Sequence, residues 1–151
     1  MSNIRLATQK DVAAVAQLVE SYWEFESIPD FHAPRIESLL KELIAQPLRG
    51  ACWVAESEGR LFGYLLAVIV FSLEHGGLMA EIDELFVSDD SRGSGTGALL
   101  VTRAERDLAE RGLVRLQLQL GVGNHHARRF YEKHGFAARA DYELLDKSLD
   151  S

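Results

Sequence analysis

The sequence is poor in the features that mark disulfide-bonded, metal-binding or membrane-spanning proteins. Its 151 residues include one cysteine, Cys52, which cannot form an internal disulfide and supplies no cluster of metal ligands. The amino terminus lacks the long apolar stretch of a signal peptide. The most apolar segment, 61–73, contains Gly63, Tyr64 and Ser72 and is too short to span a bilayer. These absences predict a cytoplasmic protein with no metal ion and no membrane partner.

Basic charge is also scarce. Sixteen Lys and Arg residues stand against 23 Asp and Glu residues, and the net charge is −7 at pH 7. This balance argues against a surface for nucleic acid. The acidic residues gather in two stretches that contain no Lys or Arg, 20–31 and 81–91. Acidic clefts attract cationic ligands, although a solvated face is the alternative interpretation of each stretch.

The hydrophobic patterning predicts one mixed α/β domain over residues 1–151. Helical spacing predicts four helices that end near Phe25, Pro47, Gly112 and Gly135. Thr8 and Asp11 precede the first of them with the spacing of a capping box. Strands are predicted over 4–7, 52–56, 60–71, 79–87, 114–120 and 142–149. The expected architecture is a mixed central sheet of about six to seven strands flanked by about four helices.

A glycine-rich loop is the most informative motif. Residues 92–97 read Arg-Gly-Ser-Gly-Thr-Gly, between a strand-like run and a helix-like run. Glycine permits close backbone approach, and a helix start presents unpaired N–H groups and the positive end of its dipole. Arg92 adds a guanidinium suited to phosphate oxygens. The loop lacks the spacing of a Rossmann fingerprint and the lysine of a P-loop. It predicts a phosphate site, with a purely structural turn as the alternative.

A second motif lies about thirty residues later. Residues 124–136 read Asn-His-His-Ala-Arg-Arg-Phe-Tyr-Glu-Lys-His-Gly-Phe, directly after the alternating strand. With both motifs in this order, the chain resembles the GCN5-related N-acetyltransferase (GNAT) superfamily over nearly its whole length. The resemblance implies the GNAT fold, acetyl-CoA as cosubstrate, and a homodimer by analogy with relatives.

The same resemblance implies three groups of residues that bind acetyl-CoA. The backbone of a strand is expected to pair with the pantetheine arm at Leu85, Phe86 and Val87. The pyrophosphate is expected at Arg92, Gly93, Ser94, Gly95, Thr96, Gly97 and Ala98. The fourth helix is expected to contact the cofactor through Asn124, His125, His126 and Ala127. The two adjacent histidines lack an acidic or cysteine partner at metal-ligand spacing, so they are interpreted as residues beside the cofactor.

Acetyl transfer to an amine needs a neutral amine, a stabilised oxyanion and a protonated leaving thiolate. Tyr131 matches the phenol that acts as general acid in the family; a tyrosine of the core is the alternative. Candidates for the group that assists deprotonation are Glu81, Asp83 and Glu84. An ordinary carboxyl is about 6 pKa units, or roughly 8 kcal/mol, short of direct abstraction from an ammonium. Strand alternation predicts Glu81 and Asp83 on one face and Glu84 on the other.

Within the superfamily, the chain looks most like the spermidine/spermine (diamine) acetyltransferase branch. Short similar stretches carry this comparison, namely Ala7-Thr8 with Asp11, 18–20, 25–26 and 83–87. It implies substrate contacts from Phe25 and Glu26, with Glu24 as a further candidate. The expected acceptor is a small cationic amine such as a polyamine or diamine. An amino group of a protein or peptide, and a catalytically silent acetyl-CoA-binding module, remain open as alternatives.

Overall fold

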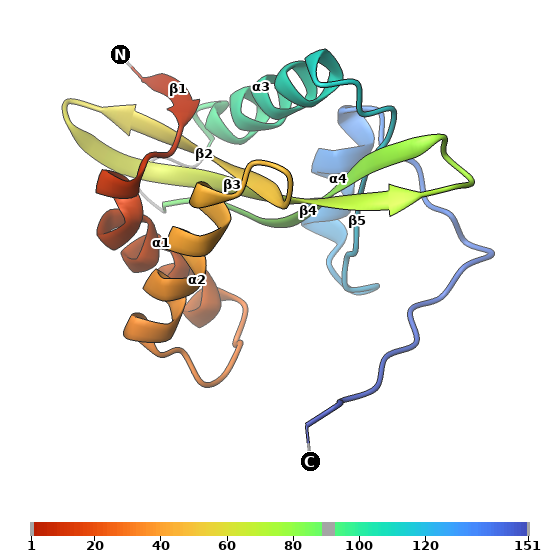
Figure 1. Ribbon diagram of the computed structural model, residues 1–151, viewed down its shortest axis with the longest axis horizontal. Helices are drawn as coiled ribbons and strands as arrows, with labels where there is room; N and C mark the ends of the chain where they lie inside the picture. Colours follow the sequence, from red (N-terminus) through yellow and green to blue (C-terminus); the bar gives the residue numbers. More distant parts are fainter. Residues whose placement is uncertain (1, 89–92, 151) are drawn as a thin grey trace. The chain divides into compact units, whose positions relative to one another are not determined.

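The structure is a computed structural model that describes residues 2–88 and 93–150. The predicted phosphate ligand Arg92 lies outside the described residues, as do Asp89 and Asp90 of the second acidic stretch. The chain forms two compact units, Met1–Gln119 and Leu120–Ser151. The first unit contains the sheet and three α-helices, and the second contains one α-helix (Figure 1).

The order of elements in the described residues follows the predicted order as far as the fourth α-helix: a strand, two α-helices, three strands, a helix, a strand and a helix. In chain order they are β1 (Asn3–Leu6), the 3₁₀ helix η1 (Gln9–Asp11), α1 (Val12–Phe25), α2 (Ala33–Ala45), β2 (Gly50–Ser57), β3 (Arg60–Ser72), β4 (Gly77–Val87), α3 (Thr96–Glu110), β5 (Leu116–Leu118) and α4 (His125–Lys133). None of the helices within residues 2–88 and 93–150 has the length and apolarity needed to cross a bilayer.

The interaction predicted at the start of the first helix is present. Asp11 Oδ2 accepts a hydrogen bond from the backbone N–H of Thr8 at 2.7 Å, which satisfies a donor that the helix ladder leaves unused. The Arg5 guanidinium donates to the same carboxylate at 2.8 Å. This hydrogen bond from Arg5 lowers the pKa of Asp11 to about 2. The helix start is therefore tied to β1.

The sheet is mixed, with its strands in the order β1-β2-β3-β4-β5. The first four strands are antiparallel neighbours, and β5 pairs in parallel with β4. Glu58 and Gly59 join β2 to β3 with φ angles of 51° and 77°. Positive φ at both central residues is what a two-residue hairpin turn requires, so the predicted hairpin is confirmed.

Helices cover both sides of the sheet. Figure 1 shows α1 and α2 on one side, here called the α1/α2 side, and α3 on the other, called the α3 side. On the α1/α2 side, Cys52, Val54 and Tyr64 pack in one buried cluster with the apolar faces of both helices. On the α3 side, Trp53 is 1% exposed, and its indole N–H donates to Asp107 of α3 at 2.8 Å. Adjacent residues of β2 thus enter two different halves of the core.

The α/β fold class is confirmed, and the number of strands is lower than predicted. The described residues contain a sheet of five strands, and 142–149 contains no strand. The apolar side chains of this segment are exposed, Leu145 at 82% and Leu149 at 91%. Alternation alone does not make a strand, because the backbone also needs a neighbour to pair with. For the same reason, the alternating run 114–120 pairs with β4 only over Leu116–Leu118.

Candidate active site

The glycine loop leads into α3 with the backbone conformation that an anion site needs. Gly93 and Gly95 have φ angles of 85° and 84°, in the left-handed region that favours glycine. A Cβ atom at either position would meet nothing within 4 Å, so conformation is what requires glycine here. Gly95 is the N-cap of α3, and the backbone ladder starts where Leu99 N donates to Gly95 O.

The first amides of α3 lie ahead of that ladder. Helix geometry leaves the N–H groups of Thr96, Gly97 and Ala98 without an intrahelical acceptor and pointing out of the helix start. The dipole of this 15-residue helix favours negative charge at the same place. Ser94 Oγ and Thr96 Oγ1 lie 2.8 Å apart, which links the loop to the first turn. This donor set fits the pyrophosphate of acetyl-CoA chemically.

Strand β4 runs toward this loop. Its parallel pairing with β5 covers Ala80–Ile82 and ends there, five residues before the strand itself ends at Val87. Leu85, Phe86 and Val87 pair with β3 on the other edge. On the edge of β4 that faces β5, the three residues expected to bind pantetheine are therefore not paired with β5. Whether they pair with the cofactor stays a prediction.

A β-bulge in β4 overturns the predicted facing of its carboxylates. Glu84 pairs with Leu66 and Ile82 pairs with Ala67, so Asp83 is the extra residue of the bulge. Glu81 pairs with Val68, two residues beyond Leu66 on β3. Cross-strand partners face the same side, and so do residues two apart. Glu81 and Glu84 therefore share the α1/α2 side, and the prediction that they face opposite sides was wrong.

Glu84 is held by two neutral donors. Its Oε1 accepts a hydrogen bond from the Tyr64 hydroxyl at 2.7 Å, and its Oε2 accepts one from the Trp23 indole at 2.9 Å. Burial raises the pKa of the Glu84 carboxyl above its usual range, the two hydrogen bonds oppose this, and the nearby Asp83 charge adds to it. The net pKa is raised. Both oxygens are engaged, so Glu84 is a fixed acceptor.

Asp83 is the more available of the two carboxylates. Burial raises the pKa of its carboxyl, and the charge of Glu81 raises it further. Within residues 2–88 and 93–150, no side-chain hydrogen bond or ion pair engages Asp83. A carboxylate with a raised pKa and open acceptor positions is suited to bind an ammonium group or to accept a proton from it.

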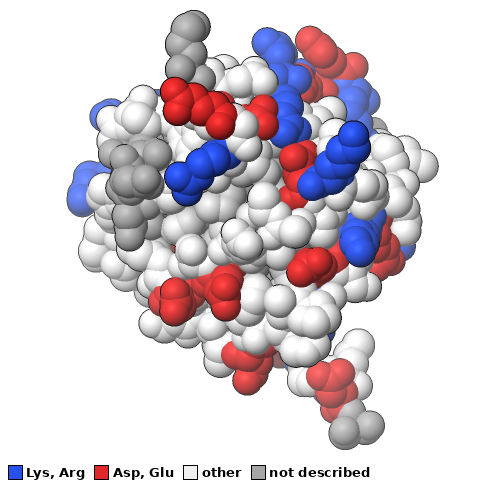
Figure 2. All heavy atoms as spheres, turned by 90° about the vertical axis from the view of Figure 1, so that its left-hand side faces the viewer, with Lys and Arg blue, Asp and Glu red and all other residues white. Residues whose placement is uncertain are grey.

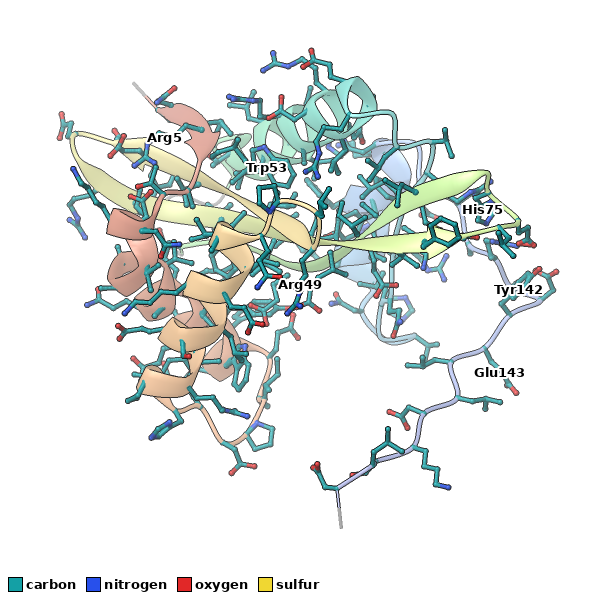
Figure 3. The ribbon with its side chains drawn as sticks, viewed as in Figure 1. Arg5, Arg49, Trp53, His75, Tyr142 and Glu143 are labelled. Carbon is teal, nitrogen blue, oxygen red and sulfur yellow. The ribbon has the colours of Figure 1, made fainter. Side chains whose placement is uncertain are left out.

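Asp83 and Glu84 line a cavity of about 260 Å³ between the sheet and helices α1 and α2. Most of its wall is apolar, from Trp23 and from Val19, Ile36, Leu39, Leu40, Leu43 and Leu66. Glu42 and Arg49 complete the lining. Figure 3 labels Arg49, which lies on the α1/α2 side of the sheet. The cavity places two carboxylates of β4 against a mostly apolar wall.

Glu81 does not line this cavity. Its Oε1 accepts hydrogen bonds from the side-chain amides of Gln117 at 3.0 Å and Gln119 at 3.5 Å. Gln117 is its partner in the parallel pairing of β4 with β5. The carboxylate is thus held at the β5 edge, apart from the wall that carries Asp83.

The predicted substrate contacts at the end of α1 are at the surface. Glu24 and Glu26 are exposed, Phe25 is 62% exposed, and none of the three lines the cavity. Burial, together with nearby carboxylates, raises the pKa of Tyr22 to about 12. Those carboxylates include Glu26 of this segment and both acids of the cavity. Figure 2 shows Asp and Glu in both halves of its face, whereas most Lys and Arg lie in the upper half.

The second unit contains the other predicted cofactor and catalytic residues. Asn124 is the N-cap of α4, and its side chain accepts a hydrogen bond from the Ala127 N–H at 3.2 Å. His125 and His126 form the first turn. The ring of Tyr131 packs edge-on against Phe130 and Phe136, at centroid distances of 5.1 and 5.4 Å. The roles of these residues stay predictions. No group of three His, Cys, Asp or Glu in the described residues is arranged to hold a metal.

The start of α3 has donors that suit a phosphate group, and it lies in the same unit as a cavity with two carboxylates, which suit a basic group. The model of the acetyltransferase (GNAT) family matches residues 15–136, and the chain belongs to this family. It is an N-acetyltransferase of a family that uses acetyl-CoA. The predicted superfamily is confirmed, and the finer resemblance to the diamine branch stays a prediction.

Three similar proteins support this assignment. An uncharacterized N-acetyltransferase of Archaeoglobus fulgidus is 32% identical over 130 residues, 85% of this chain and 88% of that protein. The uncharacterized N-acetyltransferase YhfO of Bacillus subtilis is 30% identical over 135 residues, 89% of each chain. A crystal structure of a "predicted acetyltransferase with acetyl-CoA" from Clostridium acetobutylicum superposes with a TM-score of 0.82 at 19% identity, covering 97% of this chain and 96% of that one.

Sequence reasoning missed Trp23 and Tyr64 as residues of the site. Nothing in their local sequence marks them, since each looks like an aromatic residue of a helix or strand core. Their common feature is a hydrogen bond to Glu84. The pairing of β3 with β4 brings Tyr64 to Glu84, and the packing of α1 on the sheet brings Trp23 there.

Proposed function

We propose that this N-acetyltransferase acetylates the primary amino group of a small cationic amine, with Asp83 as the residue that receives that amino group. When bound, acetyl-CoA supplies the acetyl group: the C–N bond forms, the thioester C–S bond breaks, and the ammonium gives up two protons, one of which ends on the thiol. The observation that carries the proposal is the cavity, where a carboxylate with a raised pKa lies against an apolar wall.

The three carboxylates of β4 are suited to different roles. Asp83 is free to accept N–H groups and to pass a proton through water to solvent. Glu84 is fixed by Tyr64 and Trp23, so it contributes a stationary negative charge beside the amine. Glu81 is engaged with the β5 edge and is the weakest of the three candidates.

For the leaving thiolate we propose Tyr131 as proton donor, following the family motif. A phenol and a thiol differ by only about 1.5 pKa units, so the transfer costs roughly 2 kcal/mol. The aromatic packing of Tyr131 against Phe130 and Phe136 supports a fixed ring orientation. The pyrophosphate is assigned to the loop at 93–98, with Arg92 as the expected additional ligand.

The proposal is tested by measuring thiol release from acetyl-CoA with a panel of amines. The panel contains monoamines, diamines, an aminoglycoside and peptides with a free amino terminus. Tyr131→Phe is expected to lower kcat on the order of 100-fold without changing the affinity for CoA. Tyr142→Phe is the matched control, since Tyr142 is 60% exposed and stacks under Arg139. Thermal stabilisation by CoA without acetylation of any amine would instead indicate a silent acetyl-CoA-binding module.

A further inference from the structure

The acceptor cavity carries its charge unevenly. The two carboxylates, Asp83 and Glu84, come from β4. Glu42 and Arg49 are the other charged residues of the lining, and they form an ion pair of 2.6 Å between Arg49 Nη1 and Glu42 Oε1. The negative charge of Glu42 is therefore compensated, whereas the negative charge on β4 has no basic partner among the described residues.

The sheet register separates these two groups. Leu66 of β3 pairs with Glu84 of β4 on one side and with Cys52 of β2 on the other. Glu84 is thus two strands, or about 10 Å, from β2. Arg49 precedes β2, three residues from Cys52, where its carbonyl accepts a hydrogen bond from Ile69 N. The backbone positions that carry the carboxylates and Arg49 are therefore separated by two strands of the sheet.

This distribution sets what kind of amine the cavity accepts. One ammonium group finds two carboxylates at the β4 end. A second ammonium group on the same molecule would lie among Leu40, Leu43 and Leu66, or beside the Arg49 guanidinium. Covering a second ammonium group without a partner removes part of its hydration and costs free energy, whereas covering CH₂ groups gains free energy. The apolar wall thus favours hydrocarbon over a second charge.

The cavity is also small. Its volume is about 260 Å³. This lies below the usual range of pockets for drug-sized ligands, about 300–1,000 Å³. The volume suits a short alkyl chain or a single aromatic ring.

We propose that the acceptor is a primary monoamine with a compact apolar body, and that the cavity discriminates against diamines and polyamines. This inference rests on the proposed function and narrows its substrate class. The sequence instead favours a diamine or polyamine. The difference arises because α2 supplies most of the apolar wall, and the sequence comparison identified no motif in α2.

The test uses two amines of equal size. Pentylamine and 1,4-diaminobutane each have six heavy atoms and differ in a terminal methyl or ammonium group. The wild-type enzyme is expected to give a kcat/KM for pentylamine on the order of 100-fold above that for 1,4-diaminobutane. Equal or faster turnover of the diamine would overturn the inference and leave the proposed function intact. Thiol release with none of the amines, together with CoA binding, would overturn the proposed function itself.

A charge placed in the wall provides the second arm. Leu39 lines the cavity and is 52% exposed, so Leu39→Asp adds an acid there without burying it fully. This variant is expected to reduce the preference for pentylamine about 10-fold by pairing with the second ammonium group. Leu48→Asp is the matched control: Leu48 is 84% exposed and lies outside the lining. If both variants changed the preference for pentylamine over 1,4-diaminobutane equally, the preference would depend on the overall charge of the protein and not on the cavity wall. This result would overturn the inference.

Discussion

Each side of the sheet has a carboxylate that accepts a hydrogen bond from a tryptophan indole. On the α1/α2 side Trp23 donates to Glu84 at 2.9 Å, and on the α3 side Trp53 donates to Asp107 at 2.8 Å. The surroundings of the two acids differ. Asp107 forms an ion pair of 2.9 Å with the cationic Arg103. The charged neighbour of Glu84 is instead a second carboxylate, that of Asp83.

The pKa values follow this difference. Burial pushes the pKa of Asp107 upward, but the hydrogen bonds from Trp53 and Arg103 outweigh it, and the net pKa is lowered. Burial raises the pKa of Glu84, and two neutral donors do not cancel the effect. The α3 side uses its acid to stabilise the fold. The α1/α2 side keeps uncompensated acids beside a cavity, which costs stability and is a mark of a functional site.

The largest expected effect is on stability, from the α3 side. Leu100 is fully buried, and Leu100→Ala is expected to lower the free energy of unfolding by about 3 kcal/mol through lost burial and a cavity. Its neighbour Leu99 is 50% exposed, and Leu99→Ala is expected to cost less than about 1 kcal/mol. Urea denaturation of the two variants measures both values. Equal losses of unfolding free energy in the two variants would contradict the burial of Leu100 in the core on the α3 side.

The next effect is on activity, from the α1/α2 side. Asp83→Asn is expected to lower kcat/KM on the order of 100-fold, because the amide cannot accept the proton or attract the ammonium. Calorimetric titration with CoA is expected to give an unchanged affinity. Asp146→Asn, at an exposed position of the second unit, is the control. A loss of less than threefold in Asp83→Asn would remove this residue from the proposed mechanism.

The two sides are also expected to respond to pH with opposite signs. The folded state raises the pKa of Asp83, so its ionisation destabilises the fold at pH 7, and Asp83→Asn is expected to stabilise by less than about 1 kcal/mol. The folded state lowers the pKa of Asp107, so Asp107→Asn is expected to destabilise by about 1 kcal/mol.

The Asp83 difference from the wild type should shrink as the pH falls toward about 3.9, the ordinary pKa of an aspartate, because the folded carboxyl with its raised pKa is protonated first. The Asp107 difference should shrink only as the pH falls below about 3.9, because the folded carboxyl with its lowered pKa is protonated last. Thermal unfolding between pH 7 and pH 3 measures these trends. The same sign for both variants at pH 7 would refute the electrostatic contrast between the two sides.

The smallest effect is expected within β4 itself. Glu81→Gln should change kcat/KM by less than threefold, because Glu81 is hydrogen-bonded to Gln117 outside the cavity and the amide oxygen can still accept that bond. Steady-state kinetics beside Asp83→Asn provides the comparison. A loss as large as that of Asp83→Asn would make Glu81 the acid that receives the amine.

Local rules predicted much of the fold. The Thr8–Asp11 interaction, the hairpin at Glu58 and Gly59 and the glycine loop before α3 each depend on residues close together in the chain. The prediction of a closing strand at 142–149 was wrong. A strand needs a neighbouring strand to pair with, and an alternating sequence pattern does not show whether that neighbour is present.

The sequence by itself determined the family and the candidate acids of β4, and it predicted an anion site at the start of α3, since these reside in contiguous motifs whose spacing is set by backbone geometry. The tertiary structure decided which acids act together. The bulge at Asp83 turns Glu84 to the side of Glu81, the pairing of β3 with β4 brings Tyr64 to Glu84, and the packing of α1 on the sheet brings Trp23 there. Register and helix packing arise from contacts distant along the chain, and no local pattern encodes them.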